Sequence, residues 1–409
     1  MKLFLTLLTI CTVINPEINI FNVVDASGGR LSQGINIDGQ HVKLSKLSVG
    51  IKLFDILFLI VLIDSLIKGK VYKLNKLILH KYSYIILLFI ITLMAWPTFS
   101  NAQMLTSMLY FAKFCSSIII ATLLVKYNVN INLLQKIMHP NRLKILLLIT
   151  TLNGFIIIST NYGYKFAFDN RTEYFGALGL LYVFVLNLQK SLGKKFTIWD
   201  LLLFATIVCV AFYSGKRGPS LALMLSLAVF MYTSVNYKFK LILMLSAPIA
   251  IVGFMSFQIF NVDSYQINNL SQEYREALNV LPGDLLVDKS SLERLAKILV
   301  TTEYFESKPF IGYGFWASPL VLDFLPDSLL QTPLENGALG TLAILSIFLS
   351  KFSHSVNDQA YRRIQISMFT YLLFIGISSN VFYLFQITSC YFILLALYDL
   401  LLRGSRKNA

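Results

Sequence analysis

The sequence predicts an all-α fold, a polytopic membrane helix bundle of about 12 transmembrane helices with one long, partly helical loop. Composition supports this class, because 56% of the residues are hydrophobic, 14% are charged and the mean hydropathy is +0.67. Soluble domains need about 25% charged residues for their surfaces. Long apolar runs recur along the chain, and basic residues gather in alternate connectors. We therefore expect one integral membrane domain over residues 1–409.

The spans follow from hydropathy, since a helix needs about 20 mainly apolar residues to cross the hydrocarbon core. The first run lies between Lys2 and the small residue Ala26, so a cleaved signal peptide is an alternative to the retained span that we favour. The predicted spans are residues 3–24, 50–67, 82–100, 104–125, 143–160, 174–189, 198–214, 218–235, 239–260, 335–350, 364–384 and 386–402.

The net charge of +14 follows the positive-inside pattern, which argues against a patch for nucleic acid. Basic residues concentrate in every second connector, and they also occur at both ends of the chain. We therefore expect both termini in the cytoplasm and no nucleic-acid partner. The basic connectors are residues 68–81, 126–144, 190–195, 238–240 and 351–363.

A long outer loop, residues 261–334, lies between the ninth and tenth spans and is too polar for lipid to dissolve. Arg275 belongs to a short helix expected early in this loop. Ser290 and Glu293 have the spacing of a helix-capping box, and Pro309 follows the expected end of that second helix.

The second loop helix places Arg294 and Lys297 together on its solvent-facing side. A Pro-x-x-Gly-x-Gly turn follows at residues 309–314, and Glu-Asn-Gly at residues 335–337 opens the next span. We expect this segment to cover one side of a cavity in the bundle.

A tight turn at residues 213–219 carries Lys216 and Arg217 on the outer face, where the positive-inside rule does not explain them. Its glycines allow a ligand to approach the backbone closely. Free amides at the start of the next helix add to the two cations, so the turn is a candidate anion site. The alternative is a pair of cations that extend from the helix end to the membrane interface.

Lys113 lies inside the fourth span, where a charge costs at least about 2.5–3.5 kcal/mol on insertion scales. It is therefore expected to face the bundle interior. Either it attracts an anionic headgroup of a substrate or it pairs with Asp55 of the second span. The sequence leaves both open.

The outer loop at residues 161–173 mixes aromatic and charged side chains. Tyr164 and Arg171 are candidate carbohydrate contacts, because aromatic rings stack on sugar faces and polar groups bind hydroxyls. An aromatic belt at the membrane interface explains the rings as well.

The motif search excludes several kinds of chemistry. The sequence contains no phosphate-binding Walker loop, no dinucleotide fingerprint after a strand and no His-Glu-x-x-His. All four cysteines fall in apolar runs, which indicates packing residues rather than disulfides or metal ligands. No cofactor and no metal site are predicted.

The order of motifs from about residue 210 to residue 340 resembles the bacterial O-antigen polymerase and O-antigen ligase superfamily. The resemblance rests on the Ser-Gly-Lys-Arg-Gly turn, the loop arginine, the Pro-x-x-Gly-x-Gly turn and Glu-Asn-Gly-Ala-Leu-Gly. It implies a GT-C-like fold and a lipid-dependent glycosyltransferase. That enzyme moves a glycan from undecaprenyl pyrophosphate to a lipid-linked acceptor. It also implies a bacterial inner-membrane location, a periplasmic active site and a chain-length regulator as partner.

By position, the resemblance assigns Arg217 and Arg294 to the donor pyrophosphate. Lys216, Lys297 and Arg275 are further candidate substrate contacts from their positions in the sequence. Ligases of the superfamily carry a His-Asn pair before the closing motif. Here that region, residues 326–329, reads Pro-Asp-Ser-Leu, which favours a polymerase over a ligase.

The same region offers Asp327 as the general base on the acceptor hydroxyl, with Glu335 and Glu303 as alternatives. A flippase for lipid-linked oligosaccharides is the rival outside the enzyme class. Flippases need charges deep in many helices, and such charges are sparse in this sequence.

Overall fold

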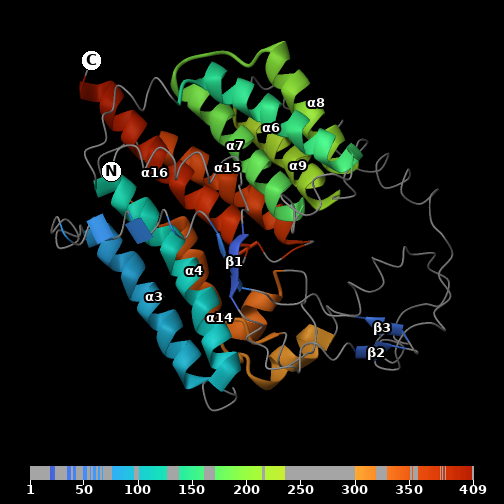
Figure 1. The fold of residues 1–409 in the computed structure, drawn as a ribbon. Helices are drawn as coiled ribbons and strands as arrows, with labels where there is room; N and C mark the ends of the chain where they lie inside the picture. The colour runs from blue at the N-terminus through green and yellow to red at the C-terminus, as the bar shows by residue number, and fades with distance from the viewer. Residues whose placement is uncertain are drawn as a thin grey trace.

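The structure is a computed structural model, and apolar helices make up most of the described chain (Figure 1). The helices are α3 (Lys76–Met94), α4 (Asn101–Lys126), α6 (Pro140–Thr160), α7 (Arg171–Ser191), α8 (Ile198–Tyr213), α9 (Arg217–Ser234), α14 (Gln331–Leu349), α15 (Asp358–Gly376) and α16 (Phe385–Lys407). Each overlaps one span predicted from hydropathy. The structure describes residues 19–23, 35–37, 40–42, 49–52, 56, 59–60, 63–64, 67, 76–95, 101–126, 138–160, 171–213, 217–234, 300–318, 329–350, 352, 358–377, 379, 381–382 and 384–407. The predicted span at 239–260 lies outside these residues.

Four short strands correct the all-α prediction near the N-terminus. β1 (Asn19–Val23) pairs antiparallel with β4 (Val49–Lys52), and β2 (Ile35–Ile37) pairs with β3 (Gln40–Val42). The span predicted at 3–24 is therefore wrong over residues 19–23, and the span at 50–67 begins in a strand. Hydropathy does not separate a short β-branched run from the end of a helix.

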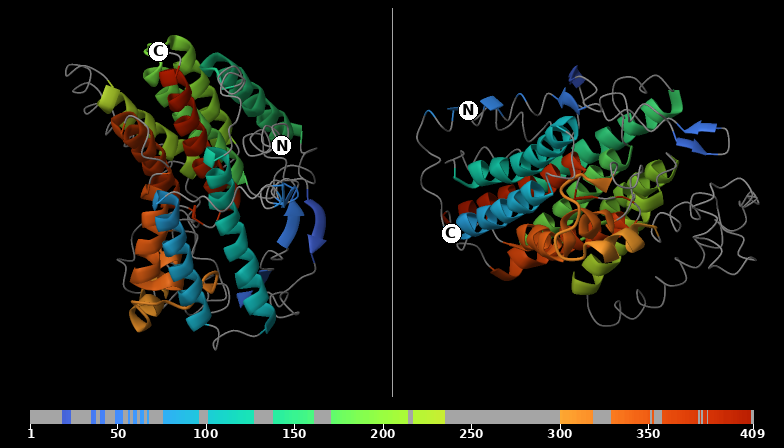
Figure 2. Two further views of the ribbon diagram at one scale, coloured as in Figure 1. Left: turned by 90° about the vertical axis from the view of Figure 1, so that its left-hand side faces the viewer. Right: turned by 90° about the horizontal axis from the view of Figure 1, so that it is seen from below.

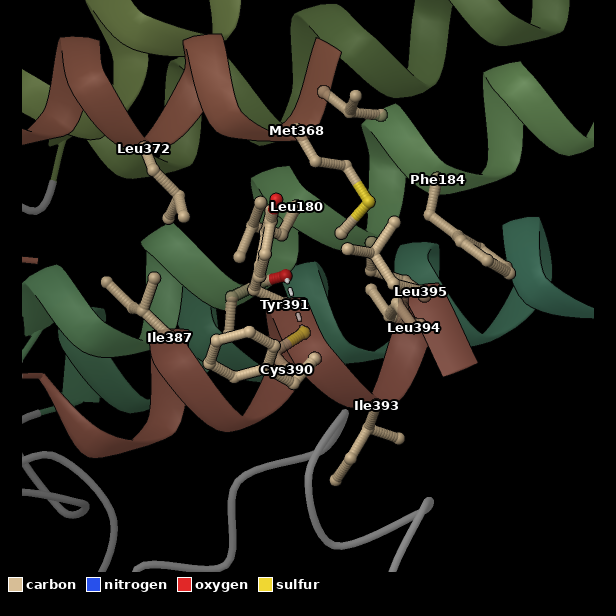
Figure 3. Packing of buried hydrophobic residues seen from close by; sticks show 14 of the residues in the cluster. Leu180, Phe184, Met368, Leu372, Ile387, Cys390, Tyr391, Ile393, Leu394 and Leu395 are labelled. Carbon is tan, nitrogen blue, oxygen red and sulfur yellow. Dashed lines mark hydrogen bonds between the residues drawn. The ribbon is translucent and has the colours of Figure 1, made fainter. Parts of the chain in front are cut away.

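The helices form two groups joined by α15 and α16. α6, α7, α8 and α9 pack together on one side, α3 packs along α14 on the other, and α16 contacts both α4 and α7 (Figures 1 and 2). α7 lies at the centre, since every residue from 174 to 189 is buried. A helix that is apolar on all sides belongs inside a bundle. Figure 3 shows Leu180 of α7 beside Met368 of α15 and Tyr391 of α16.

One end of the bundle collects basic side chains and the chain turns between helices, and we call it the basic end. Burial and the nearby charges of Lys194 and Arg142 lower the pKa of His139 there, so its ring stays neutral at pH 7. The contacts at this end join Lys81 Nζ to the carbonyl of Ser350 at 2.6 Å, Lys144 to Asp200 at 2.6 Å, Lys194 Nζ to His139 Nε2 at 3.1 Å, and Ser191 to Tyr398.

Local signals set the turn from α7 to α8 at the basic end. Gly193, with φ +70°, ends α7 in a Schellman motif, in which Lys194 N donates to the carbonyl of Gln189 at 3.0 Å. Asp200 forms one half of a capping box at the start of α8, since its carboxyl accepts from the Thr197 amide at 2.8 Å and from the Thr197 hydroxyl at 2.7 Å. The basic connector predicted at 190–195 is thus a defined turn.

Lys81 is buried, although the sequence placed it at the edge of a basic connector. Its ammonium group donates to the carbonyls of Ile347 and Ser350 and lies 4.3 Å from the ring centre of Phe352. These carbonyls end α14, so the lysine caps that helix and fastens α3 to it.

The outward faces of the helices carry large apolar side chains. Ile86 is 58% exposed, and Ile145 and Ile149 are each 59% exposed. Soluble proteins rarely expose so many in continuous stripes. Among the described residues, Ser107–Val125 and Gln331–Leu349 are long and apolar enough to cross a membrane, and shorter apolar helices occur in α3, α8, α9 and α16.

Candidate active site

Two separate sequence motifs meet at the end of the bundle opposite the basic end. The Pro-x-x-Gly-x-Gly turn lies against the first turns of α14, and four backbone hydrogen bonds join them. We call residues 309–318 with residues 331–339 the loop–helix junction; it appears in orange in Figures 1 and 2. The donors and acceptors are Tyr313 N to Leu334 O (3.2 Å), Gly314 N to Glu335 O (2.6 Å), Ala338 N to Pro309 O (2.8 Å) and Leu339 N to Phe310 O (3.2 Å).

The predicted loop helix is confirmed where the structure describes it, since residues 300–307 are helical and the chain turns at Pro309. Gly312 and Gly337 then make the close contact possible. Both have positive φ, +73° and +61°. A Cβ on Gly312 would lie 2.5 Å from the carbonyl oxygen of Glu335, and one on Gly337 would lie 2.3 Å from the carbonyl of Phe310. Only glycine fits either position without moving the backbone.

Glu335 fixes the second half of the junction from a fully buried position. Its Oε2 accepts from the Trp316 amide at 2.8 Å, and its Oε1 accepts from the Ser318 amide at 3.1 Å. Gln331 Nε2 and the Ser318 hydroxyl also donate to Oε1. Because both oxygens are occupied by donors, this carboxyl group serves as a structural acceptor, which weakens its interpretation as an alternative general base.

We expect Glu335→Gln to destabilise the protein, because its amide group would present N–H donors to the backbone amides that now bind a carboxylate oxygen. A buried donor that loses its acceptor costs about 1–3 kcal/mol. Thermal unfolding of the detergent-solubilised protein measures the effect, and Glu303→Gln, on the exposed side of the 300–307 helix, is the control. Loss of activity with an unchanged unfolding midpoint would instead favour Glu335 as a base.

Trp316 has a left-handed backbone conformation with φ +60°, which costs a bulky residue about 1–3 kcal/mol. Its ring stacks on Tyr110 of α4, with centroids 3.9 Å apart and planes 15° apart. The neighbouring carbonyl, of Phe315, accepts a hydrogen bond from the Ser107 hydroxyl at 2.5 Å. The junction is thus attached to the start of α4 as well as to α14.

Two predicted site residues begin helices at this same end. Arg217 is the first residue of α9, and Arg171 is the first residue of α7. Both helices run from there toward the basic end, where Lys190 and Ser191 lie in the last turn of α7. The backbones of the two arginines therefore lie at the end of the bundle that holds the loop–helix junction. Their side chains are outside the described residues.

Lys113 is half-buried in α4, about 18 Å along the helix from its first residue. Its possible partner Asp55 is outside the described residues, so the two sequence interpretations of this lysine stay as predictions. The remaining candidates also lie outside the described residues: Tyr164, Lys216, Arg275, Arg294, Lys297 and Asp327.

Sequence reasoning missed Trp316, Tyr110, Ser318 and Gln331. A tryptophan two residues after the glycine turn was the available signal for Trp316. Its stacking partner is about 200 residues earlier in the chain, and a positive φ at a non-glycine residue has no signature in a single sequence.

The fold and the site define a membrane-associated helical protein in which a structured loop docks onto one end of the bundle. A family model described as O-antigen ligase matches residues 201–345. That region includes most of α8, all of α9, the loop–helix junction and most of α14, and the match supports a relationship to the O-antigen ligase and polymerase superfamily. Among curated proteins, none matches the chain. The family supports a role for a membrane glycosyltransferase-like enzyme in O-antigen biosynthesis.

Proposed function

We propose that the protein is a repeat-unit polymerase for O antigen or a related surface polysaccharide. It transfers the growing glycan from undecaprenyl pyrophosphate to a lipid-linked repeat unit. The observation that carries this proposal is the superfamily pattern over residues 201–345, combined with Pro-Asp-Ser-Leu where ligases carry a His-Asn pair.

The reaction requires a hydroxyl of the acceptor sugar to attack the anomeric carbon of the donor. The bond from that carbon to the pyrophosphate oxygen breaks, and undecaprenyl pyrophosphate leaves as an anion. The pyrophosphate would be bound by Lys216, Arg217 and Arg294. An arginine donates two parallel hydrogen bonds to phosphate oxygens, and these bonds strengthen as negative charge develops on the leaving group. Asp327 would accept the proton of the attacking hydroxyl.

Further substrate contacts are proposed for Lys297, Arg275, Lys113, Arg171 and Tyr164, and the lipid tail would lie in a groove between helices. The basic end would face the cytoplasm together with both termini. The loop at 261–334 and the active site would then face the periplasm in the bacterial inner membrane. A chain-length regulator is the proposed protein partner.

The two alternative functions are a ligase of the same superfamily and a lipid-linked oligosaccharide flippase, and one experiment distinguishes them from a polymerase. The flippase is less well supported, because the described charged contacts gather at the basic end and not along a central path. Within the residues that the structure describes, no comparable feature separates a ligase from a polymerase.

The test is a gel of lipopolysaccharide from cells that lack the gene. A polymerase predicts loss of the long-chain ladder while lipid A-core with a single repeat unit persists. Loss of the single-repeat band as well would contradict a polymerase. In that case, extraction of the lipid carrier separates the alternatives, since a ligase mutant accumulates polymer on the carrier and a flippase mutant accumulates single units.

A further inference from the structure

The loop–helix junction presents an aromatic pair that the pyrophosphate chemistry does not use. Trp316 and Tyr110 come from segments far apart in the chain, yet their rings stack at a centroid distance of 3.9 Å. Both residues are only half-buried. We propose that this pair is a sugar-stacking platform for the lipid-linked glycan. This proposal rests on the function proposed above.

The surrounding contacts hold the tryptophan in one place. Glu335 binds the Trp316 amide, Ser107 binds the carbonyl of the preceding residue, and Gly314 O accepts from the Ala317 amide at 3.1 Å. This bonding maintains a backbone conformation that tryptophan rarely adopts. A ring that served only to fill space would not need it, because apolar packing tolerates many side-chain shapes.

The chemistry of the pair fits a pyranose ring. One face of such a sugar presents C–H groups with partial positive charge, and an aromatic face is electron-rich. Trp and Tyr offer large, rigid surfaces with few rotatable bonds. Lys113 lies three residues after Tyr110, so it shares that face of α4 one turn deeper in the bundle.

The position of the pair is also suitable for substrate access. The junction lies at the end of the bundle where α9 begins with Arg217 and where α7 begins with Arg171. A lipid-linked donor bound there through its pyrophosphate would extend its glycan away from the lipid, across the same end. A platform beside the charged groups would set the angle of the sugar.

Aromatic residues also collect at membrane interfaces, where they contact lipid headgroups. If Trp316 had only that role, its fluorescence would depend on its depth in the membrane and would not respond to a glycan. The protein has three tryptophans, Trp96, Trp199 and Trp316. Replacing Trp96 and Trp199 with phenylalanine leaves Trp316 as a single fluorescent reporter.

The probes for this reporter are undecaprenyl pyrophosphate carrying the repeat unit and undecaprenyl pyrophosphate without sugar, each in nanodiscs. We expect a saturable change in Trp316 emission with the glycan-bearing lipid and a much smaller one with the bare lipid. Equal responses to the two lipids would overturn the platform. So would strong quenching by brominated phospholipid with no response to the glycan.

Kinetics give the second readout. Trp316→Ala should raise KM for the lipid-linked glycan about tenfold and change kcat less than about twofold, whereas Trp316→Phe should stay within about threefold of the parent. Trp199→Ala is the matched control, because Trp199 is 71% exposed in the first turn of α8 at the basic end. A fall in kcat alone, with KM unchanged, would contradict the proposal.

These outcomes separate the two proposals. The emission change requires binding and no turnover, so a glycan response in a protein that makes no polymer would retain the platform and reject the polymerase. Normal polymerisation without a change in Trp316 emission would support the polymerase and reject the platform.

Discussion

Arg217→Ala and Arg294→Ala are each expected to remove the polymer ladder and to leave lipopolysaccharide that carries one repeat unit. The departing pyrophosphate gains charge as its bond to the sugar breaks, and a preorganised arginine stabilises that charge. Removing one such donor slows the chemical step by about 10²–10³-fold. A chain needs many successive additions, so this loss eliminates long products while single units are still ligated.

Arg142→Ala is the control for this pair of variants, because Arg142 is exposed at the basic end. Its ladder should match the parent. Arg217→Lys tests the geometry, since lysine keeps the charge and loses the paired hydrogen bonds, and we expect a shortened ladder. Gels of lipopolysaccharide, normalised to the amount of protein in the membrane, provide the measurement. Full-length chains in both alanine variants would refute the assigned roles.

The helices were predictable from the sequence because each is a long apolar run with its own boundaries. The end of α7 and the start of α8 show why, since Gly193, Thr197 and Asp200 act within a few residues of one another. Signals of this kind are local and can be read directly. The same holds for the turn at Pro309, whose residues specify a break in the helix.

The contacts between distant segments were not predictable. Glu335 was expected to begin a span, but its role depends on two backbone amides 17 and 19 residues earlier in the chain. Lys81 was counted with a basic connector, yet it is buried against the end of α14. A single sequence gives the type of each residue and leaves its long-range partner unspecified.

The strands β1 and β4 show a different limit. Their residues are apolar enough to extend a neighbouring hydrophobic run, so a hydropathy window includes them in a span. Pairing between Asn19–Val23 and Val49–Lys52 is what makes them strands. That pairing crosses more than 25 residues and leaves no mark within either segment.

Gly312→Ala should strongly destabilise the loop–helix junction. The new Cβ would meet the carbonyl oxygen of Glu335 and the amide of Gly337, each at 2.5 Å, and it would also have to adopt φ +73°. Both contacting atoms belong to the backbone, so the steric overlap can be removed only if the turn and α14 move apart. Backbone strain and overpacking together cost about 2–5 kcal/mol.

Gly193→Ala isolates the conformational part of that cost. Gly193 has nearly the same φ, +70°, but a Cβ there would have nothing within 4 Å. We expect this control to lose about 1–2 kcal/mol and to keep the full polymer ladder. Differential scanning fluorimetry in detergent compares the two unfolding midpoints. If the two unfolding midpoints fell equally, the contact of the new Cβ with the backbone of α14 would add nothing to the conformational cost. A larger fall in Gly312→Ala, together with loss of polymer, would indicate that activity depends on the two motifs being held together.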